Sequence, residues 1–236
     1  MSDVFFKFPR TPHLYWLGKT QPRADKVLSE MDAKIFLKNR LIVEEKVDGA
    51  NIGISLDSAG RLRVQNRGNY LNRESHLQFQ TLWVWLDCHR DLLIKNLESG
   101  LILFGEWCFA RHSKYYDALP DWFLLFDVYD RNSGDFWAAS RRSEMAVKIG
   151  LSQVPTISEG FFSKNKLLQL LGPSKIGNTP MEGVYLRVDD DLRLMLRAKI
   201  VRADFSESIK DHWSAKPIEK NTLKKVAYST LQLAQR

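Results

Sequence analysis

Short apolar segments separated by turn residues constrain the fold of this chain more than any other feature of its sequence. Residues 41–46 and 50–56 flank Asp48-Gly49, a dipeptide that favours a tight hairpin because glycine tolerates positive φ angles. A second turn at residues 57–60 leads to a third strand-like segment, residues 61–65. These segments predict a three-stranded antiparallel meander.

Four later segments also have the length and composition of strands. They are residues 101–108, 122–129, 182–188 and 192–201. The turn-like run Asp189-Asp190-Asp191 separates the last two and predicts a second antiparallel pair.

Helical patterns lie between the strand-like segments. Amphipathic spacing predicts one or two helices between about 73 and 97. Ser140 and Ser163 are candidate N-caps of two shorter helices that end near Gly150 and Gly172. The expected class is therefore α+β, with antiparallel sheets and flanking helices.

The chain of 236 residues is expected to form one main domain over residues 1–201, followed by a short basic helical extension over residues 202–236. Its 44% apolar and 27% charged content is typical of a soluble globular protein. The N-terminus shows no secretory leader, and no apolar run approaches the ~20 residues that span a bilayer. We therefore expect a cytoplasmic protein without membrane contact.

Charge and cysteine content give weaker constraints. A formal net charge of +7 favours a polyanionic partner, although many basic proteins have no nucleic-acid role. The two cysteines, Cys88 and Cys108, have no Cys or His neighbour at metal-ligand spacing, which argues against a disulfide framework or a zinc site. We expect both to be packed thiols.

Lys46 is the first candidate for chemistry. It ends a predicted strand beside a glycine turn, where its amine can face an open pocket while the turn backbone approaches a phosphate. A deprotonated lysine can attack a phosphorus atom. Taken alone, the same residues also describe an ordinary surface lysine beside a hairpin turn.

Six segments together resemble, in order, the motifs of the covalent nucleotidyltransferase superfamily of DNA ligases, RNA ligases and mRNA-capping enzymes. The segments are Lys46-Val47-Asp48-Gly49, Gln65-Asn66-Arg67-Gly68, Phe104-Gly105-Glu106-Trp107-Cys108, the aromatic-Asp strand at 122–129, Glu182-Gly183-Val184-Tyr185-Leu186-Arg187, and Arg197-Ala198-Lys199. The resemblance covers nearly the whole chain and is closest to small nick-sealing ATP-dependent RNA ligases of bacteria and phages. It implies the ligase adenylation-domain fold.

The resemblance also implies roles for particular residues. Lys46 would become attached to AMP, with Asp48, Glu182 and Lys199 as further catalytic residues. Glu182 would hold Mg²⁺ or Mn²⁺ through water. The residues implied in binding ATP are Glu45, Lys46, Arg67, Glu106, Phe126, Glu182, Arg197 and Lys199.

Strand alternation supports a shared role for Arg197 and Lys199, near the end of the domain. It places Met195, Arg197 and Lys199 on one strand face, where positive charge would lower the pKa of Lys46 and bind the α-phosphate. The alternative is a solvated basic face. Arg197 stands where RNA ligases often have a second lysine, so its role need not transfer intact.

Glu106 and Phe126 lie in apolar strands. A carboxylate in the setting of Glu106 needs a dedicated partner, which by resemblance is the ribose and otherwise is water or a structural arginine. Phe126 would stack on adenine unless it is simply core, whereas Phe123 lies on the opposite strand face and is expected to be packing. Glu45 points away from Lys46 and is a candidate contact for the adenine amino group.

The loop at residues 111–116 mixes basic and aromatic side chains. Arg111 and Lys114 are candidate nucleic-acid contacts, but solvated loops often have the same composition, and His112 can equally be structural. Asp48 either supports the reactive lysine or a metal-bound water, or only forms the turn.

The short C-terminal part separates this chain from some members of the superfamily. The 37 residues after Lys199 cannot form the oligonucleotide-binding barrel of DNA ligases and capping enzymes. The leading hypothesis is an ATP-dependent RNA ligase for RNA repair, acting on RNA or mixed RNA/DNA ends of a nicked duplex, with a protein partner aiding substrate binding. The alternatives are a minimal DNA ligase, another nucleotidyltransferase, and a noncatalytic nucleic-acid-binding module.

Overall fold

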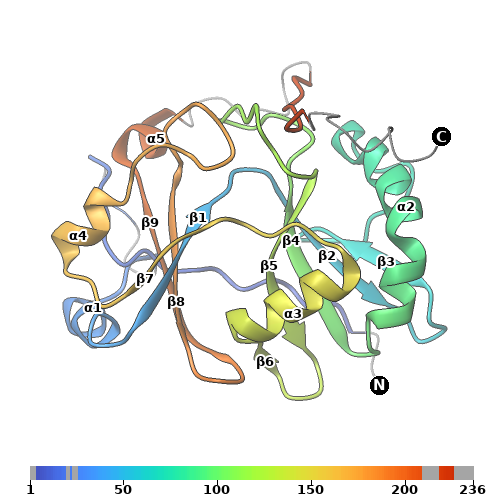
Figure 1. Ribbon diagram of the computed structural model, residues 1–236, viewed down its shortest axis with the longest axis horizontal. Coiled ribbons are helices and arrows are strands. Elements are labelled where there is room, and N and C mark those ends of the chain that lie inside the picture. The colour runs from blue at the N-terminus through green and yellow to red at the C-terminus, as the bar shows by residue number, and fades with distance from the viewer. Residues whose placement is uncertain (1–3, 20–21, 23–25, 209–217, 226–236) are drawn as a thin grey trace, which may run out of the picture.

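Two antiparallel sheets organise the computed structural model, which describes residues 4–19, 22, 26–208 and 218–225 (Figure 1). The four-stranded sheet has the order β7-β1-β8-β9, and the five-stranded sheet has the order β3-β2-β4-β5-β6. The strands of the first sheet are β1 Leu41–Lys46, β7 Thr156–Gly160, β8 Gly183–Asp189 and β9 Leu194–Val201. Those of the second are β2 Ala50–Leu56, β3 Leu62–Gln65, β4 Leu101–Trp107, β5 Phe123–Asp130 and β6 Asp135–Phe136.

The α+β class with antiparallel sheets is confirmed, and the seven predicted strands are present with ends shifted by at most two residues. β6 and β7 were not predicted. β7 carries Thr156, Ser158 and Glu159 among its five residues, so it lacks an apolar run that would identify a strand.

The predicted meander is wrong at its first turn. β1 pairs with β7 and β8, whereas β2 pairs with β3 and β4, so Val47 to Gly49 carry the chain from one sheet to the other. Gly49 has no positive φ angle. Instead, a Cβ atom at Gly49 would lie 2.7 Å from the Trp107 carbonyl oxygen, closer than real Cβ atoms approach. Glycine is required here by close packing of two backbones.

Two helices cover one face of the five-stranded sheet. They are α2 Gln80–Asn96, preceded by a 3₁₀ turn at Leu77–Phe79, and α3 Ala139–Ile149. Their side chains form the larger core with the inner residues of β2, β4 and β5. The cap prediction at Ser140 is wrong, because Ala138 is the N-cap and Asp189 Oδ2 accepts the Ala139 amide at 2.6 Å.

The four-stranded sheet has its own core and two short helices. These are α1 Glu30–Phe36, which was not predicted, and α4 Lys164–Gln169, which Ser163 caps as predicted. α4 ends three residues before Gly172, the predicted stop. Of the two cysteines, Cys108 is buried as expected, but Cys88 is exposed on α2, which corrects the expectation of two packed thiols.

The N-terminal segment, residues 4–14, joins the two sheets. Phe6 stacks on Tyr129 with ring centroids 3.6 Å apart, and Phe8 packs in the same aromatic cluster on the five-stranded sheet. Further along, the carbonyl of Pro12 accepts the Lys199 amide at 2.9 Å, and the Leu14 amide donates to the Lys199 carbonyl at 2.8 Å. The segment therefore ends against β9, the edge strand of the other sheet.

Among the described residues after β9, helix is present at Ala203–Ser208 and absent from 218–225. Helix α5 spans Ala203–Ser208, whereas residues 218–225 are extended and form bridges to Ala110 and Leu119, which corrects the expected helix over that stretch. Residues 209–217 and 226–236 lie outside the described part. Among the helices that the structure describes, none is long and apolar enough to cross a bilayer.

Candidate active site

A cavity with about 580 Å³ of empty space lies between the two sheets, and we call it the first cavity. β1, β8 and β9 contribute to its wall from one sheet, and β2, β4 and β5 from the other. The predicted site residues that line it are Glu45, Lys46, Arg67, Glu106, Phe126 and Lys199. The fold therefore brings most of the predicted nucleotide contacts to one place.

Lys46 ends β1 opposite Gly183 of β8, which places Glu182 beside it. The Nζ atom lies 2.6 Å from Glu182 Oε2, and the two side chains are 25% and 5% exposed. Burial by itself would lower the pKa of Lys46, but Glu182, Glu106 and Asp48 raise it. The expectation that neighbouring basic residues depress this pKa is therefore wrong for the ligand-free site, because carboxylates surround the amine.

The carboxyl group of Glu182 responds to the same surroundings. Burial raises the pKa of Glu182 to about 7, although the ion pair with Lys46 opposes the shift. A carboxylate at hydrogen-bond distance from the amine is positioned to accept a proton from it.

Of the two basic residues predicted on β9, only Lys199 lines the first cavity. Burial and the charge of Lys46 lower the pKa of Lys199 to about 8. Arg197 lies instead over the rings of Phe136 and Phe8, at 4.4 and 5.2 Å from their centroids. Its Nη1 is 3.7 Å from Asp127 Oδ2. The structure does not bring Arg197 into the cavity lining, because the aromatic cluster and Asp127 hold its guanidinium.

Glu106 presents an acceptor that the protein leaves unused. Its Oε2 atom is buried and has no hydrogen-bond partner among the described residues. Burial raises the pKa of Glu106 to about 8, against the opposing charges of Lys46 and Arg67. A buried carboxyl oxygen without a partner at a cavity wall can accept a hydrogen bond from a hydroxyl group of a ligand.

Phe126 lines the same cavity and is half-buried, with its ring 5.3 Å from that of Phe8 in a T-shaped arrangement. Three strand positions earlier, Phe123 is fully buried in the larger core, which confirms its predicted packing role. The exposed side of Phe126 is suited to stacking on a flat base.

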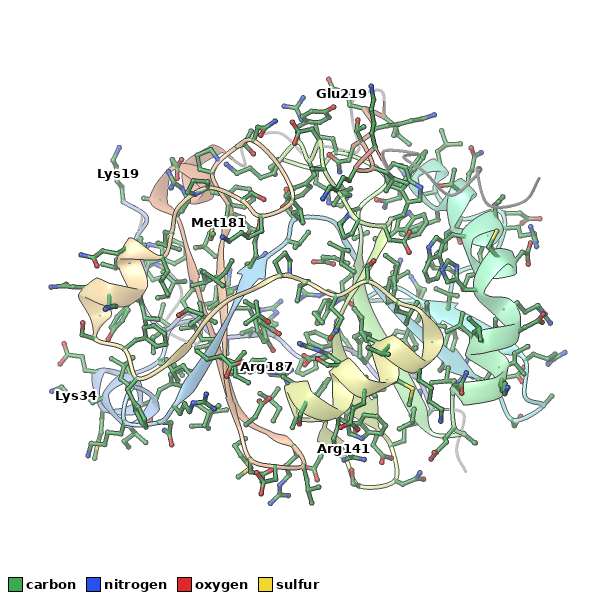
Figure 2. The ribbon with its side chains drawn as sticks, viewed as in Figure 1. Lys19, Lys34, Arg141, Met181, Arg187 and Glu219 are labelled. Carbon is green, nitrogen blue, oxygen red and sulfur yellow. The ribbon has the colours of Figure 1, made fainter. Side chains whose placement is uncertain are left out.

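Two buried arginines that the sequence did not single out hold the backbone at Phe126. Arg142 of α3 donates to the Phe126 carbonyl at 2.5 Å, and Arg187 of β8 donates to the same oxygen at 3.2 Å. Arg142 also pairs with Glu44 at 2.5 Å, and Arg187 pairs with Asp127. In Figure 2, Arg187 is labelled toward the middle of the molecule. In the sequence, Arg187 belongs to the motif that begins at Glu182 and Arg142 lies in a polar stretch, so neither indicated a contact with Phe126.

Glu45 is turned toward a neighbouring loop, on the opposite side of β1 from Lys46. Its carboxylate accepts hydrogen bonds from Ser174 Oγ at 2.5 Å and the Lys175 amide at 2.8 Å. Burial nevertheless raises its pKa. Glu45 also lines the first cavity, so its contact with a base stays a prediction.

Asp48 anchors the loop that follows β4. Its Oδ2 accepts the amides of Ser113 and Lys114 at 2.7 and 3.1 Å, and its own amide donates to the Tyr116 hydroxyl at 2.8 Å. Asp48 thus fixes the chain immediately after Lys46. These hydrogen bonds of Asp48 do not include one to Lys46.

The predicted nucleic-acid contacts in this loop engage the protein itself. Arg111 Nη1 lies 2.6 Å from Glu219 Oε2, near the upper edge of Figure 2, and Lys114 Nζ lies 5.6 Å from the Phe205 ring. His112 Nε2 is 3.0 Å from Gln78 Oε1, which favours its structural interpretation. Contact of Arg111 and Lys114 with a nucleic acid remains a prediction.

The described residues contain no group of three His, Cys, Asp or Glu side chains arranged to hold a metal ion. Mg²⁺ keeps several waters and commonly binds through few carboxylates together with phosphate oxygens. A single carboxylate such as Glu182 therefore fits a water-mediated contact with the ion but not a complete protein ligand set.

The sequence of this chain matches a known protein family. The model of the RNA ligase family matches residues 39–202, well over half of the chain. The chain belongs to the RNA ligase family. Lys46, Glu106, Glu182 and Lys199 all lie within the matched residues.

Solved structures support the fold of this RNA ligase family member. A variant of Naegleria gruberi RNA ligase with ATP and Mn has a TM-score of 0.61 and 15% identity, covering 89% of this chain and 66% of that chain. The Naegleria gruberi RNA ligase with PPi has a TM-score of 0.59 and 16% identity, covering 90% of this chain and 64% of the other. An apo variant of a Naegleria gruberi RNA ligase has a TM-score of 0.60 and 15% identity, covering 90% of this chain and 60% of that chain.

At these identities the similarity shows the fold, and this chain spans 60% of the length of the apo ligase chain. A search of curated protein sequences finds no match to this chain.

Proposed function

We propose that this protein is an ATP-dependent RNA ligase that works through a lysyl-AMP intermediate on Lys46. One observation carries the proposal: Lys46 Nζ lies 2.6 Å from Glu182, in a cavity that also presents the unpartnered Oε2 of Glu106. The Naegleria gruberi ligases of the same fold include structures with ATP and Mn and with PPi, which supports ATP as the AMP donor.

The first step forms a bond between Lys46 Nζ and the α-phosphorus of ATP, while the bond from that phosphorus to the bridging oxygen breaks and pyrophosphate leaves. The ammonium must first lose a proton, for which Glu182 Oε2 is the acceptor at hand. The second nitrogen proton is released to water as the phosphoramidate forms. Lys199, at the wall of the same cavity, stabilises the negative charge on the α-phosphate.

The remaining nucleotide contacts follow from the cavity wall. Glu106 Oε2 accepts a hydrogen bond from a ribose hydroxyl, and Phe126 stacks on the base. Arg67 borders the cavity with Lys199 and adds positive charge for phosphate. Glu182 contacts a hydrated Mg²⁺ or Mn²⁺, which supplies charge neutralisation at the phosphates when bound.

In the later steps AMP passes from Lys46 to the 5′-phosphate of a polynucleotide, and a 3′-hydroxyl then displaces AMP to join the ends. The net charge of +7 favours a polyanionic acceptor, and membership of the RNA ligase family supports RNA or mixed RNA/DNA ends. A nicked duplex, a protein partner for substrate binding, and a cytoplasmic place in RNA repair are further parts of the proposal.

The test is incubation with α-labelled ATP and Mg²⁺ or Mn²⁺, followed by denaturing electrophoresis. We expect label on the intact protein and none on Lys46→Ala, because no other nitrogen occupies that position. Lys38→Ala, an exposed lysine change just after α1, is the matched control and should label normally. Label on Lys46→Ala would place the nucleophile elsewhere, and absence of label on the intact protein, once prior adenylation has been excluded, would contradict the proposal.

Acceptor choice is measured separately with the labelled protein. Nicked duplexes with RNA or DNA on each side of the nick are compared for sealing. We expect sealing to require RNA on at least one side, whereas equal sealing of all-DNA nicks would indicate a minimal DNA ligase.

A further inference from the structure

A second cavity adjoins the first; it is open to solvent, and the space among its lining residues is about 1330 Å³, open solvent included. Thr11, Arg67 and Lys199 line both cavities, so the two are continuous at these side chains. Glu182, the partner of Lys46, also lines the second cavity. Lys46 therefore lies at the junction of the two spaces.

The wall of the second cavity is strongly basic. Arg10, Lys26, Arg67 and Lys199 contribute four positive charges, and Glu182, the carboxylate in its wall, is already paired with Lys46. Clustered cations repel one another unless an anion lies among them. The charge pattern points to an anionic ligand.

His13 shows that this wall is more than a group of surface lysines. Its side chain lines the second cavity, the residue is only 8% exposed, and its Nδ1 has no hydrogen-bond partner among the described residues. Burial, together with Lys199, Lys46 and Lys26, lowers its pKa to about 4. The protein thus buries a neutral polar ring among cations and leaves one of its nitrogens unsatisfied, which costs stability unless a ligand compensates.

Backbone hydrogen bonds fix the segment that carries these groups. The His13 amide donates to the Lys26 carbonyl at 2.7 Å, and the Leu28 amide donates to the His13 carbonyl at 2.9 Å. Together with the bonds of Pro12 and Leu14 to Lys199, they hold two N-terminal stretches against β9. Both stretches precede residue 39, where the match to the family begins.

The proposed reaction requires a binding site for phosphate groups beside the nucleotide cavity. In phosphoryl transfer the attacking and leaving atoms stand roughly in line across the phosphorus. Pyrophosphate therefore leaves from the side opposite Lys46 Nζ, and in the next step the 5′-phosphate oxygen of the acceptor attacks from that same side. A basic cavity continuous with the nucleotide cavity can receive either group.

We propose that Arg10, His13 and Lys26, which precede the residues matched by the family, form a phosphate-binding subsite together with Arg67 and Lys199. Its ligand is a phosphate oxyanion, supplied by the β- and γ-phosphates of ATP or by the 5′-phosphate of the polynucleotide. The assignment of these sources rests on the proposed ligase function, whereas binding of the anion does not.

The direct test is titration calorimetry of the full-length protein with inorganic pyrophosphate. Arg10 and Lys26 are exposed, so Arg10→Ala and Lys26→Ala remove charge without disturbing the core, and His13→Asn keeps a polar group in the buried position. Each change is expected to weaken pyrophosphate binding on the order of tenfold, the usual effect of losing one charged hydrogen bond. Lys38→Ala removes the same charge at an exposed position that lines neither cavity, so this variant should bind as the intact protein does.

Two kinetic arms distinguish the sources of the phosphate. In the first, the ATP concentration that half-saturates lysyl-AMP formation is measured for each variant. In the second, protein already adenylated and freed of pyrophosphate is mixed with 5′-phosphorylated RNA, and AMP transfer is followed. A tenfold change in the first arm identifies the ATP phosphates, a change in the second identifies the acceptor phosphate, and changes in both show successive use of one subsite.

Pyrophosphate affinities of Arg10→Ala, Lys26→Ala and His13→Asn equal to that of Lys38→Ala would overturn the subsite, provided urea unfolding shows that the variants are folded. This result is distinguishable from failure of the ligase proposal. Without label on Lys46 but with pyrophosphate binding that depends on His13, the subsite stands and the ligase function falls. With normal labelling but pyrophosphate binding that none of the three changes alters, the ligase function stands and the subsite falls.

Discussion

At the scale of single residues, the site is dominated by carboxyl groups that the fold holds in unfavourable surroundings. Glu106 has a buried oxygen without a partner, and its pKa is raised to about 8 from an ordinary value of 4.5. Such a group costs folding free energy, and proteins retain groups of this kind chiefly at functional sites. Under the proposed function, stability and nucleotide binding therefore oppose each other at Glu106.

We predict that Glu106→Gln stabilises the free protein at neutral to alkaline pH. Because the folded-state pKa is above the unfolded one, the folded protein binds the proton more tightly, and stability falls as pH rises from about 4.5 to about 8. Glutamine does not ionise, so the advantage of the variant over the intact protein should grow by about 2 to 4 kcal/mol between about pH 5 and about pH 8.

The measurement is the free energy of unfolding in urea at both pH values for the intact protein and for Glu106→Gln. Glu182 also titrates in this range and interacts electrostatically with Glu106, so the difference between the two proteins reports Glu106 together with its coupling to Glu182. Glu219→Gln, a change at an exposed carboxylate, is the control and should show no growing advantage. A constant difference between Glu106→Gln and the intact protein would show that Glu106 is solvated. The same variant should lose affinity for AMP, because an amide accepts a ribose hydroxyl less strongly.

The ion-pair partner of Lys46 could not be predicted from the sequence. Its place at a strand end before Asp48-Gly49 was evident from the sequence, but its partner was not. Glu182 is 136 residues away and reaches Nζ only because β1 and β8 pair in the register Lys46 to Gly183. Burial and three carboxylates, rather than neighbouring basic residues, therefore determine the pKa of the free lysine.

At the scale of elements, residues 218–225 support the turn that follows Lys46. Asn221 is buried, accepts the Tyr116 amide at 2.9 Å and donates to the Cys108 carbonyl at 2.8 Å. Tyr116 in turn accepts the Asp48 amide, two residues after Lys46. Asn221 and Tyr116 thus connect residues 218–225 to the backbone that follows Lys46.

We predict that Asn221→Ala lowers the free energy of unfolding by about 2 to 4 kcal/mol, because it leaves a buried amide and a buried carbonyl unpaired. Lysyl-AMP formation should also slow, since the loop that holds Asp48 loses its support. Urea unfolding and labelling with ATP measure the two effects.

Glu219→Ala is the control on the same stretch. Its ion pair with Arg111 is exposed, so its loss should cost less than about 1 kcal/mol. Equal effects of Asn221→Ala and Glu219→Ala would show that residues 218–225 do not support the loop.

At the scale of the whole molecule, two sheets with separate cores enclose the first cavity. The N-terminal segment, the crossover at Gly49 and the Arg142 and Arg187 network join them. A ligand in this cavity contacts both sheets, so its binding should stabilise the molecule as a unit.

We predict that AMP, which binds without transferring a group, raises the free energy of unfolding by about 2.7 kcal/mol at a hundred times its dissociation constant. Phe126→Ala removes the stacking ring and should reduce this gain at the same AMP concentration. Urea unfolding with and without AMP measures both proteins. An undiminished gain for Phe126→Ala would place the base elsewhere.

The local structure and the order of the motifs could be predicted from the amino-acid sequence. Strand propensity and apolar alternation depend on neighbouring residues, so seven strands and the face of Phe123 could be predicted. The match of six motifs to one superfamily likewise required only their order along the chain, and family membership bears it out.

How these strands and motifs contact one another depends on tertiary packing. The sheet change at Gly49, the pairing of Lys46 with Glu182 and the turning of Arg197 toward Phe136 all depend on contacts between residues distant in sequence. The environments of the His13 ring and of the buried Asn221 amide also depend on residues distant in sequence. Periodicity reports which face a side chain occupies, but strand pairing and burial determine what it touches.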